Sequence, residues 1–451
     1  MKIILLTPGT GSYHCGVCMR DNALAKELIR QGHDAVMVPM YLPLTLDESA
    51  ATPRTPIFFG GVTTYLREKV PLLRRMPRWM DRLLSSRALL RLVAGKAAAQ
   101  TGGPDVAEMT LSMLRGEQGN QATELDELIA WLRADGKPDA VWLSTALQAG
   151  LARKIKAALG VPVIGFLQGE DSFLDGLGTG WSSRAWAMLA ERMRDADLWI
   201  APSRYFAELM ATRLGWSLAE SAHRMRVVPN GISLEGYRSE RRATTGGKTQ
   251  TIGYLARFIP AKGLGLLVDA FIHLKQSGRG AGVRLRCAGS MTDTDAVYVD
   301  ELKRKLSKAE LAGDVEWLPN VTREEKIAFL ETLDVFSVPA TYSEAFGMYV
   351  IEALAAGVPV IAPEASAFPE ILAATGGGRL FQLDSDPDVS AAHLADVLAG
   401  LLADPAAALA LGEAGRLAVR EQFSIESLAR HLARLTGEIR AGNLAPSGAA
   451  A

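Results

Sequence analysis

The sequence has only three cysteines in 451 residues. So few thiols cannot form a disulfide framework, which favours a reducing compartment such as the cytoplasm. Two of them form the pair Cys15-Gly-Val-Cys18, and His14 raises the local number of metal ligands only to three, fewer than a closed zinc site needs. We interpret Cys15 and Cys18 as small loop residues; a redox pair at a helix N-terminus is the alternative.

A long hydrophobic run and an excess of charge of either sign are also missing. The first segment, MKIILLTPGTGSYHCG, reaches Pro8 and Gly9 too soon for a signal peptide or a membrane span, so we interpret it as a buried first strand and expect a cytoplasmic protein. The formal net charge is −1, and charged residues make up 22% of the chain. This balance gives no sign of a nucleic-acid-binding surface, and we expect no nucleic-acid partner.

The length of the chain exceeds what one hydrophobic core usually supports, which predicts two domains. Short apolar runs alternate with helical patterns, the first helix spanning about Met19 to Gln31, and this is typical of βα units around a parallel sheet. A second series begins after RSERRATTGGKTQ, so the predicted fold class is α/β with two Rossmann-like doubly wound domains. The strand candidates are KIILLTP, DAVMVPM, DAVWLST, VPVIGFLQ and DLWIAPS in the first series, and QTIGYLA, VRLRCAG, DVEWLP, DVFSVPA and VPVIAP in the second.

The domain boundary is expected in the Gly-rich, charged stretch 238–250. We predict an N-terminal domain over residues 1–235 and a C-terminal domain over residues 236–420. Residues 421–441 form an amphipathic pattern and are predicted to be a helix that packs back on the N-terminal domain. Residues 442–451 form a small-residue tail that we expect to be disordered.

One segment of the N-terminal domain, residues 65–96, is basic. Arginines and lysines outnumber acids there, and Leu, Trp and Met recur at helical spacing. The segment is predicted to belong to a helical insertion over about 65–130. Its basic face either contacts an anionic membrane surface or acceptor, or is merely solvated; Pro71 and Pro77 break up a long amphipathic helix and favour the solvated face.

Ligands of open parallel α/β sheets bind beyond the carboxyl ends of the strands. After KIILLTP, the loop Gly9-Thr-Gly-Ser-Tyr-His-Cys-Gly16 brings three glycines to the start of a helix, where the backbone can approach an anion. The spacing is not the GxGxxG dinucleotide fingerprint. A tight βα turn would also need glycine, so this loop alone is a weak indication of ligand contact.

Two cations follow the first strand of the second series. Arg257 and Lys262 stand in YLARFIPAKG, at a strand end and near the next helix start. They can neutralise a diphosphate, Arg as a planar fork and Lys as a point charge. Solvated loop cations are the alternative.

Two acids, Glu344 and Glu352, stand in SEAFGMYVIEALAAGVPVIA. The apolar pattern predicts a helix that begins near Phe346 and ends at Gly357, with Glu344 in the loop or first turn and Glu352 roughly two turns inside. Carboxylates suit the diol of a ribose or hexose. Helix-end electrostatics for Glu344 and a solvated face for Glu352 are the alternative.

The free backbone N–H groups of Phe346, Gly347 and Met348 at this helix start suit phosphate oxygens. Together with the two cations, this context favours a functional role for the two acids over helix-end electrostatics and a solvated face.

These motifs resemble those of the retaining glycosyltransferases of the GT-B fold, family 4, which use nucleotide-activated sugars. The resemblance rests on ARFIPAKG, on SEAFGMYVIEALAAGVPVIA as the family's Glu-x7-Glu, on VVPNGIS at 227–233, and on the Gly-rich first loop leading to LIRQGHDAV. It extends over nearly the whole chain and implies two Rossmann-like domains that face a central cleft.

The resemblance also implies roles for single residues. Arg257 and Lys262 would hold the donor diphosphate, Glu352 the ribose, and Glu344 with the N–H groups that follow it the donor sugar. Gly16 of the first loop would join the donor site. The donor-binding candidates are therefore Gly16, Arg257, Lys262, Glu344, Phe346, Gly347, Met348 and Glu352, and the catalytic candidates are Glu344, Arg257 and Lys262.

The sequence departs from the family pattern in three places. Gln168 in GFLQGED stands where the family often has His, and it can orient a hydroxyl but not shuttle a proton. Ala345 replaces the usual Gly of an E-G-F-G run. The strand end CAGS at Cys287 has fewer glycines than the common pattern, which leaves base recognition open.

The predicted function is transfer of a hexose from a nucleotide-diphosphate sugar, with UDP, GDP and ADP all open, to an unidentified acceptor with retention. Gln168, Glu170 and Asp171 are the acceptor-side candidates. No DxD-type acidic cluster stands out, so we expect no metal and no cofactor; the nucleotide sugar is a co-substrate. A nucleotide-sugar epimerase or phosphorylase, or a non-catalytic sugar-nucleotide-binding scaffold, are the alternatives.

Overall fold

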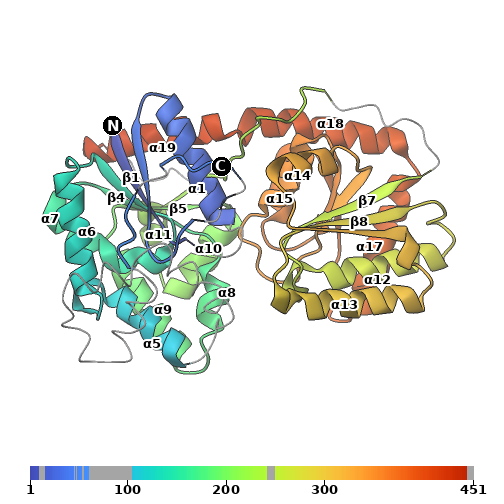
Figure 1. Cartoon of the computed structure of the whole chain (residues 1–451), viewed down its shortest axis with the longest axis horizontal. Helices are drawn as coiled ribbons and strands as arrows, with labels where there is room; N and C mark the ends of the chain where they lie inside the picture. Colours follow the sequence, from blue (N-terminus) through green and yellow to red (C-terminus); the bar gives the residue numbers. More distant parts are fainter. Residues whose placement is uncertain are drawn as a thin grey trace. The chain divides into compact units, whose positions relative to one another are not determined.

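The computed structural model describes residues 1–9, 16–44, 46, 48–52, 55–59, 104–240 and 249–443. The chain forms two compact units, each around its own parallel sheet (Figure 1). Unit 1 consists of Met1–Pro229 and Leu428–Ala451, and unit 2 of Asn230–Ser427. The predicted α/β class with two Rossmann-like sheets is confirmed. Unit 1 ends at Pro229 rather than at residue 235, and the chain returns to it inside the last helix.

The sheet of unit 1 has the strand order β2-β1-β3-β4-β5-β6, and all its pairs are parallel. Its central strands are almost wholly buried, which explains why they read as continuous apolar runs. The strands are β1 Lys2–Thr7, β2 Asp34–Pro39, β3 Ala140–Leu143, β4 Val163–Phe166, β5 Leu198–Ala201 and β6 Met225–Val227.

Side-chain caps begin several helices of unit 1. Ser203 Oγ accepts a hydrogen bond from the Phe206 N–H at 3.0 Å, and Ser217 Oγ accepts one from the Glu220 N–H at 3.1 Å. The helices are α1 Gly16–Arg30, α5 Pro104–Arg115, α6 Ala122–Ala134, α7 Ala152–Leu159, α8 Glu170–Asp175, α9 Trp181–Met193, α10 Arg204–Leu214 and α11 Leu218–Arg224, with 3-10 turns η2 Gly116–Gln118 and η3 Ala146–Leu151.

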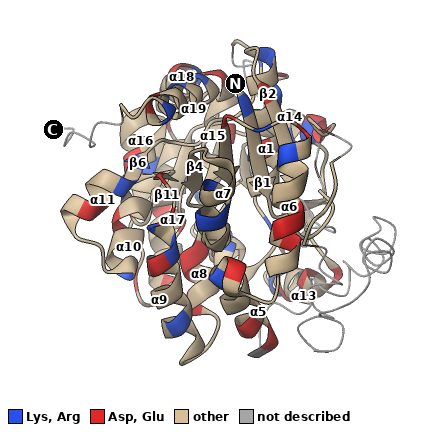
Figure 2. Ribbon diagram, turned by 90° about the vertical axis from the view of Figure 1, so that its left-hand side faces the viewer, with Lys and Arg blue, Asp and Glu red and all other residues tan. Residues whose placement is uncertain are grey.

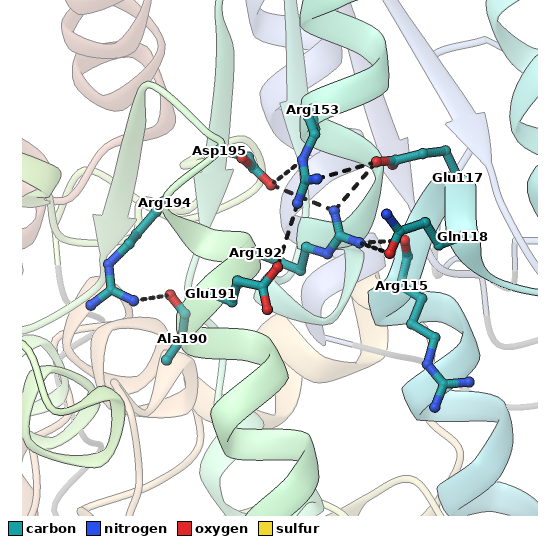
Figure 3. Close-up of polar contacts among 9 residues, drawn as sticks. All are labelled: Arg115, Glu117, Gln118, Arg153, Ala190, Glu191, Arg192, Arg194 and Asp195. Carbon is teal, nitrogen blue, oxygen red and sulfur yellow. Dashed lines mark hydrogen bonds and ion pairs between the residues drawn. The ribbon is translucent and has the colours of Figure 1, made fainter.

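A charged network holds the α5–η2 segment against α7 and α9 (Figure 3). Arg192, only 1% exposed, donates to the Arg115 carbonyl at 2.7 Å and lies 3.5 Å from the Glu117 carboxylate. Arg153 approaches the same carboxylate at 3.6 Å and bonds to Asp195 at 3.1 Å. These contacts pair the buried Arg192 guanidinium and tie η2 to α7 and α9.

The sheet of unit 2 has the order β12-β11-β10-β7-β8-β9, again with parallel pairs. In Figure 1 helices α12, α13 and α17 lie on one side of it, and α14, α15 and α18 on the other. The strands are β7 Thr251–Leu255, β8 Arg284–Gly289, β9 Val315–Pro319, β10 Val335–Ser337, β11 Val360–Pro363 and β12 Gly378–Phe381.

Two capping boxes begin helices of unit 2, at Thr292 with Asp295 and at Thr322 with Glu325. The helices are α12 Leu264–Gln276, α13 Asp293–Lys308, α14 Arg323–Leu330, α15 Met348–Ala355, α16 Phe368–Thr375, α17 Pro387–Leu402 and α18 Pro405–Gln422, with 3-10 turns η4 Pro260–Lys262 and η5 Ala312–Asp314.

The last helix, α19 Ile425–Arg440, belongs largely to unit 1. Arg440 forms an ion pair at 2.9 Å with Asp139, directly before β3. At its start, the Ile232 and Ser424 backbones form a parallel bridge. Among the described helices none is by itself long and apolar enough to cross a membrane, although α17 and α18, bent by 98° at their junction, meet the length and composition test as a pair.

Two edge strands are missing from the ten that the sequence predicts. β6 and β12 lie at the outer edges of their sheets, and each contains an arginine and partly exposed positions. An edge strand is covered on fewer sides than a central one, so its residues do not form the continuous apolar run by which the other strands are found.

Several predictions fall outside the described residues. These are the basic segment 65–96, most of the Gly-rich loop with His14 and Cys15, and nearly all of the tail. Cys18 is described and is a buried residue of α1. On the described ribbons in Figure 2, basic and acidic residues are interspersed.

Candidate active site

The carboxyl ends of β7 and β10 bring two distant loops together. The strands are parallel neighbours, so the loops that follow them leave the same edge of the sheet. Gly263, at the end of the first loop, has φ +74°, and a Cβ there would lie 1.8 Å from the Pro339 carbonyl oxygen of the second. Only glycine permits this approach, which places Lys262 beside Glu344 although they are 82 residues apart.

Three donors converge on one oxygen of Glu344. Its Oε2 accepts from Lys262 Nζ at 2.6 Å, from the Tyr342 hydroxyl at 2.7 Å and from the Tyr349 hydroxyl at 2.8 Å. The Lys262 ammonium also bonds to the Tyr342 hydroxyl and lies 4.8 and 5.2 Å from the centres of the two tyrosine rings. Within the described residues, no hydrogen bond reaches Glu344 Oε1. One face of this carboxylate is therefore held, and the other is available.

The second acid has a similar arrangement. Helix α15 begins at Met348, later than predicted, so Glu352 lies little more than one turn inside it rather than two. Its Oε1 accepts from Lys326 Nζ of α14 at 2.8 Å, and no described residue donates to its Oε2. Glu352 therefore also keeps one oxygen for a ligand.

The backbone at the start of α15 fits the prediction of free donors. Gly347 is the N-cap residue, with φ +84°. Within the described part of the chain, the N–H groups of Phe346, Gly347 and Met348 donate to no other residue. They lie at the positive end of the helix dipole, two to four residues after Glu344 along the chain. Phosphate oxygens are suitable acceptors for them.

Arg257 is held by an acid rather than standing alone. Its guanidinium donates twice to Asp295, at 3.2 Å from Nε and from Nη2, across the carboxyl ends of β7 and β8. Burial raises the pKa of Asp295, but hydrogen bonds from Thr292 and Arg257 outweigh it and leave the pKa below its usual value. Asp295 stays ionised and fixes the direction of the guanidinium fork.

At the carboxyl edge of the sheet in unit 1, the structure places a buried charged cluster that the sequence analysis missed. Arg20 of α1 bonds to its neighbour Asp21 at 3.0 Å and lies 4.6 Å from the centre of the Phe166 ring. Asp21 accepts from Thr7, the last residue of β1, at 2.9 Å and from Ser144, which follows β3. The cluster fixes the second turn of α1 to the strand ends.

Three acceptor-side candidates follow β4 in unit 1, and they differ in what their side chains do. Both Glu170 oxygens are occupied: Oε1 accepts from Thr145 at 2.7 Å and from the Ala146 N–H at 2.8 Å, and Oε2 from the Gln168 and Gly169 N–H groups at 2.8 and 3.1 Å. Glu170 therefore joins the loops after β3 and β4.

The other two candidates keep polar atoms unpaired. Gln168 Nε2 and Asp171 Oδ1 are buried and have no hydrogen-bond partner among the described residues. Gly16, the fourth candidate of unit 1, is the exposed first residue of α1. Unpaired buried polar atoms carry a cost that a bound ligand can remove.

Two family models of known proteins match this chain, one in each half of the sequence. A family model described as Glycosyltransferase Family 4 matches residues 96–235, and one described as Glycosyl transferases group 1 matches residues 238–418. The chain belongs to family 4 of the GT-B glycosyltransferases. The name of the family carries no statement about which sugar or acceptor this chain uses.

Relatives of this family 4 chain include two proteins of Mycobacterium tuberculosis. A phosphatidyl-myo-inositol mannosyltransferase is 32% identical over 195 residues, which are 43% of this chain and 49% of that protein, so the match spans about half of the relative's length. A GDP-mannose-dependent alpha-(1-6)-phosphatidylinositol monomannoside mannosyltransferase is 26% identical over 400 residues, 83% of this chain and 94% of that protein.

Solved structures share the fold of this family 4 chain. Sucrose-phosphate synthase from Thermosynechococcus elongatus superposes with a TM-score of 0.69 at 18% identity, covering 98% of this chain and 100% of that one. HepE of Anabaena, in complex with UDP and glucose, gives a TM-score of 0.63 at 15% identity, with 97% and 99% covered. These likenesses concern the fold.

The structure of this family 4 chain brings some candidates together and leaves others apart. Lys262 contacts Glu344 directly, and the three N–H donors follow Glu344 in the chain, whereas Arg257 and Glu352 are each bound to other residues. The sequence analysis missed the residues that hold the site: Tyr342, Tyr349, Lys326 and Asp295. Tyr349 had a usable signal, because it stands five residues after Glu344 within the apolar pattern of the predicted helix. Lys326 had none, since α14 precedes the motif by some twenty residues.

The buried acid Asp171 predicts a pH dependence of stability. Burial raises its pKa, and the charge of Glu170 adds to the shift. Because the folded state then binds the proton more tightly than the unfolded state does, this group lowers the free energy of unfolding as pH rises from about 4 through the raised value. Asp171→Asn should therefore stabilise the protein at pH 7 by on the order of 1 kcal/mol, with a smaller gain at about pH 4, in urea unfolding.

Asp175→Asn on the same helix is the matched control. Asp175 is paired with Arg213 at 2.6 Å and accepts from the Trp186 indole at 2.9 Å, so its replacement should destabilise the protein. Equal effects of the two substitutions at pH 7 would contradict the assigned cost of ionised Asp171.

Proposed function

We propose that this protein is a glycosyltransferase that moves a hexose from a nucleotide-diphosphate sugar to an acceptor hydroxyl with retention of anomeric configuration. The observation that carries the proposal is the Lys262–Glu344 pair beside the free N–H groups at the start of α15. Cationic and N–H donors suit a diphosphate, and a carboxylate with an available oxygen suits sugar hydroxyls. A ligand in which a sugar is joined to a diphosphate would use both kinds of group at one place.

The chemistry follows from this arrangement. The bond between the anomeric carbon and the diphosphate oxygen breaks, and a bond from the same carbon to the acceptor oxygen forms on the same face. The acceptor proton passes to the departing diphosphate. Lys262, Arg257 and the N–H groups of Phe346, Gly347 and Met348 stabilise the negative charge that grows on the leaving group, which is the electrostatic contribution that most lowers such barriers.

The two acids divide the donor between them. Glu352 would accept from the ribose hydroxyls through its available oxygen, and Glu344 from the hexose. No step of this proposal needs a metal ion or a cofactor, because protein donors neutralise the diphosphate. Gly16, Gln168 and Asp171 of unit 1 are proposed for the donor diphosphate and the acceptor, with Glu170 shaping their loop.

The names of the relatives suggest which substrates to test first. Two relatives are mannosyltransferases of phosphatidylinositol lipids, one of them dependent on GDP-mannose, and HepE was solved with UDP and glucose. We therefore propose to test GDP-mannose as the first donor and phosphatidylinositol in vesicles as the first acceptor. If the acceptor is a lipid, the basic segment 65–96 is proposed to contact the anionic membrane that contains it, from the cytoplasmic side.

The deciding experiment incubates the purified protein with GDP-mannose, UDP-glucose or ADP-glucose, with and without acceptor vesicles. We expect acceptor-dependent release of the nucleoside diphosphate and a product whose anomeric configuration, read by proton NMR coupling, equals that of the donor. Isomer formation from a donor alone would favour an epimerase. Tight nucleotide-sugar binding without turnover of any donor or acceptor would favour a binding scaffold.

A further inference from the structure

The Glu344 carboxylate is held from one side only, and the residue that holds it most rigidly is Tyr349. Oε2 accepts three hydrogen bonds, while Oε1 accepts none from the described residues. We propose that Tyr349 is a positioning residue for transfer, which fixes Glu344 so that Oε1 alone receives the donor hexose. This inference rests on the proposed function.

Packing determines where the Tyr349 hydroxyl lies. The side chain is 7% exposed, and its ring stands 6.4 Å from the Phe336 ring and 6.4 Å from the Phe368 ring, measured between centres. Gly347 also belongs to this packing, because a Cβ there would lie 3.1 Å from the Phe368 ring. A ring confined in this way cannot turn away, so its hydroxyl is a fixed donor.

Electrostatics keeps that donor protonated. Burial raises the pKa of Tyr349 well above its usual value, and the Glu344 charge raises it further. A neutral phenol donates a hydrogen bond to the carboxylate without adding a second negative charge beside it. By contrast, Tyr342 is only partly buried, and Lys262 is a flexible side chain with 20% exposure.

The three holding groups differ in whether they remain when the donor binds. Lys262 is the group that a diphosphate attracts, because its ammonium is the nearest point charge. As the ammonium turns toward phosphate, the carboxylate loses its strongest partner. Tyr349 and Tyr342 then keep Oε2 in place, so Oε1 does not rotate into the position that Oε2 had. In this way the tyrosines make the sugar contact independent of the phosphate contact.

Tyr349→Phe is the test, since it removes one oxygen atom and leaves the packed ring. We expect kcat to fall about tenfold, as for one lost hydrogen bond to a charged group, while the Kd of the nucleoside diphosphate alone changes less than twofold. Tyr298→Phe is the matched control: this tyrosine of the same unit accepts from the Gly265 N–H at 2.8 Å and does not contact Glu344, so its kcat should equal that of the parent.

A thermal-unfolding cycle of Tyr349→Phe, Glu344→Gln and the double variant gives a readout that needs no turnover. The proposal expects the double variant to be less destabilised than the sum of the single variants, because each removes the same contact. Unchanged kcat in an active Tyr349→Phe enzyme, or additive effects in the cycle, would overturn the inference. A parent protein that transfers no sugar overturns the proposed function instead, and the cycle then still decides whether Tyr349 holds Glu344.

Discussion

Replacing Lys262 by alanine is expected to weaken donor binding and turnover together. A charge-assisted hydrogen bond to phosphate is worth about 1.5–3 kcal/mol, or about tenfold to more than a hundredfold in a binding constant. The loss should appear in the Kd of the nucleoside diphosphate, measured by calorimetry, and again in kcat, because the departing diphosphate carries more charge than the bound one. Stability should change less than binding, since Tyr342 and Tyr349 still donate to Glu344.

Lys275→Ala is the matched control for this substitution. Lys275 lies on α12 of the same unit and pairs with Asp314 at 2.8 Å, and its 13% exposure is close to the 20% of Lys262. It should lose stability without losing donor affinity. Equal nucleoside diphosphate affinity and equal rate in Lys262→Ala and the parent would remove Lys262 from the donor site.

Most of the fold could be predicted because the central strands of unit 1 are almost wholly buried and the other predicted strands are largely apolar. Ten strands were predicted from short, largely apolar runs between helical patterns. β6 and β12 carry Arg226 and Arg379 at sheet edges, where solvent makes a charged side chain acceptable. Their sequences alone do not separate them from loops.

The sequence indicated the candidate residues Lys262 and Glu344, but not the residues that hold them. Lys262 and Glu344 stand in local motifs, so each is recognised without knowing its neighbour. That they touch depends on β7 and β10 being adjacent, an order that the linear sequence does not state. Lys326 reaches Glu352 for a similar reason, from a helix whose own sequence has no site motif.

Glu170 makes contacts that its sequence position did not indicate. An acid directly after a strand end suggested an acceptor contact, yet its two oxygens accept four hydrogen bonds from the loops after β3 and β4. The sequence indicates that Glu170 follows a strand end. It does not indicate that Thr145 and Ala146 lie close enough to donate hydrogen bonds to its carboxylate. Its role in our proposal is accordingly to shape the loop that presents Gln168 and Asp171.

The two acids of the motif are expected to fail in different ways when each becomes glutamine. Glu352→Gln should raise the KM for the donor about tenfold and leave kcat nearly unchanged, because the ribose lies away from the reacting bond and contributes equally in the ground and transition states. Glu331→Gln is the control: Glu331 has the same 17% exposure as Glu352 and pairs with Arg238 at 3.0 Å, outside the site. Its donor KM should match the parent.

Glu344→Gln should instead lower kcat, by about a hundredfold, with a smaller change in KM, because a preorganised charge beside the reacting sugar acts mainly in the transition state. The amide would present either an uncharged oxygen or an N–H group to Lys262 and the tyrosines. The substitution therefore weakens the hydrogen bonds that hold the side chain as well as the proposed contact with the sugar. Steady-state kinetics with varied donor separates the two constants, and thermal unfolding checks that both variants fold. Two well-folded variants with identical kinetic profiles would refute the division of labour between the acids. Full activity in both variants would mean that neither acid binds the donor. Glu344 would then only interact with the helix dipole, and Glu352 would only pair with Lys326.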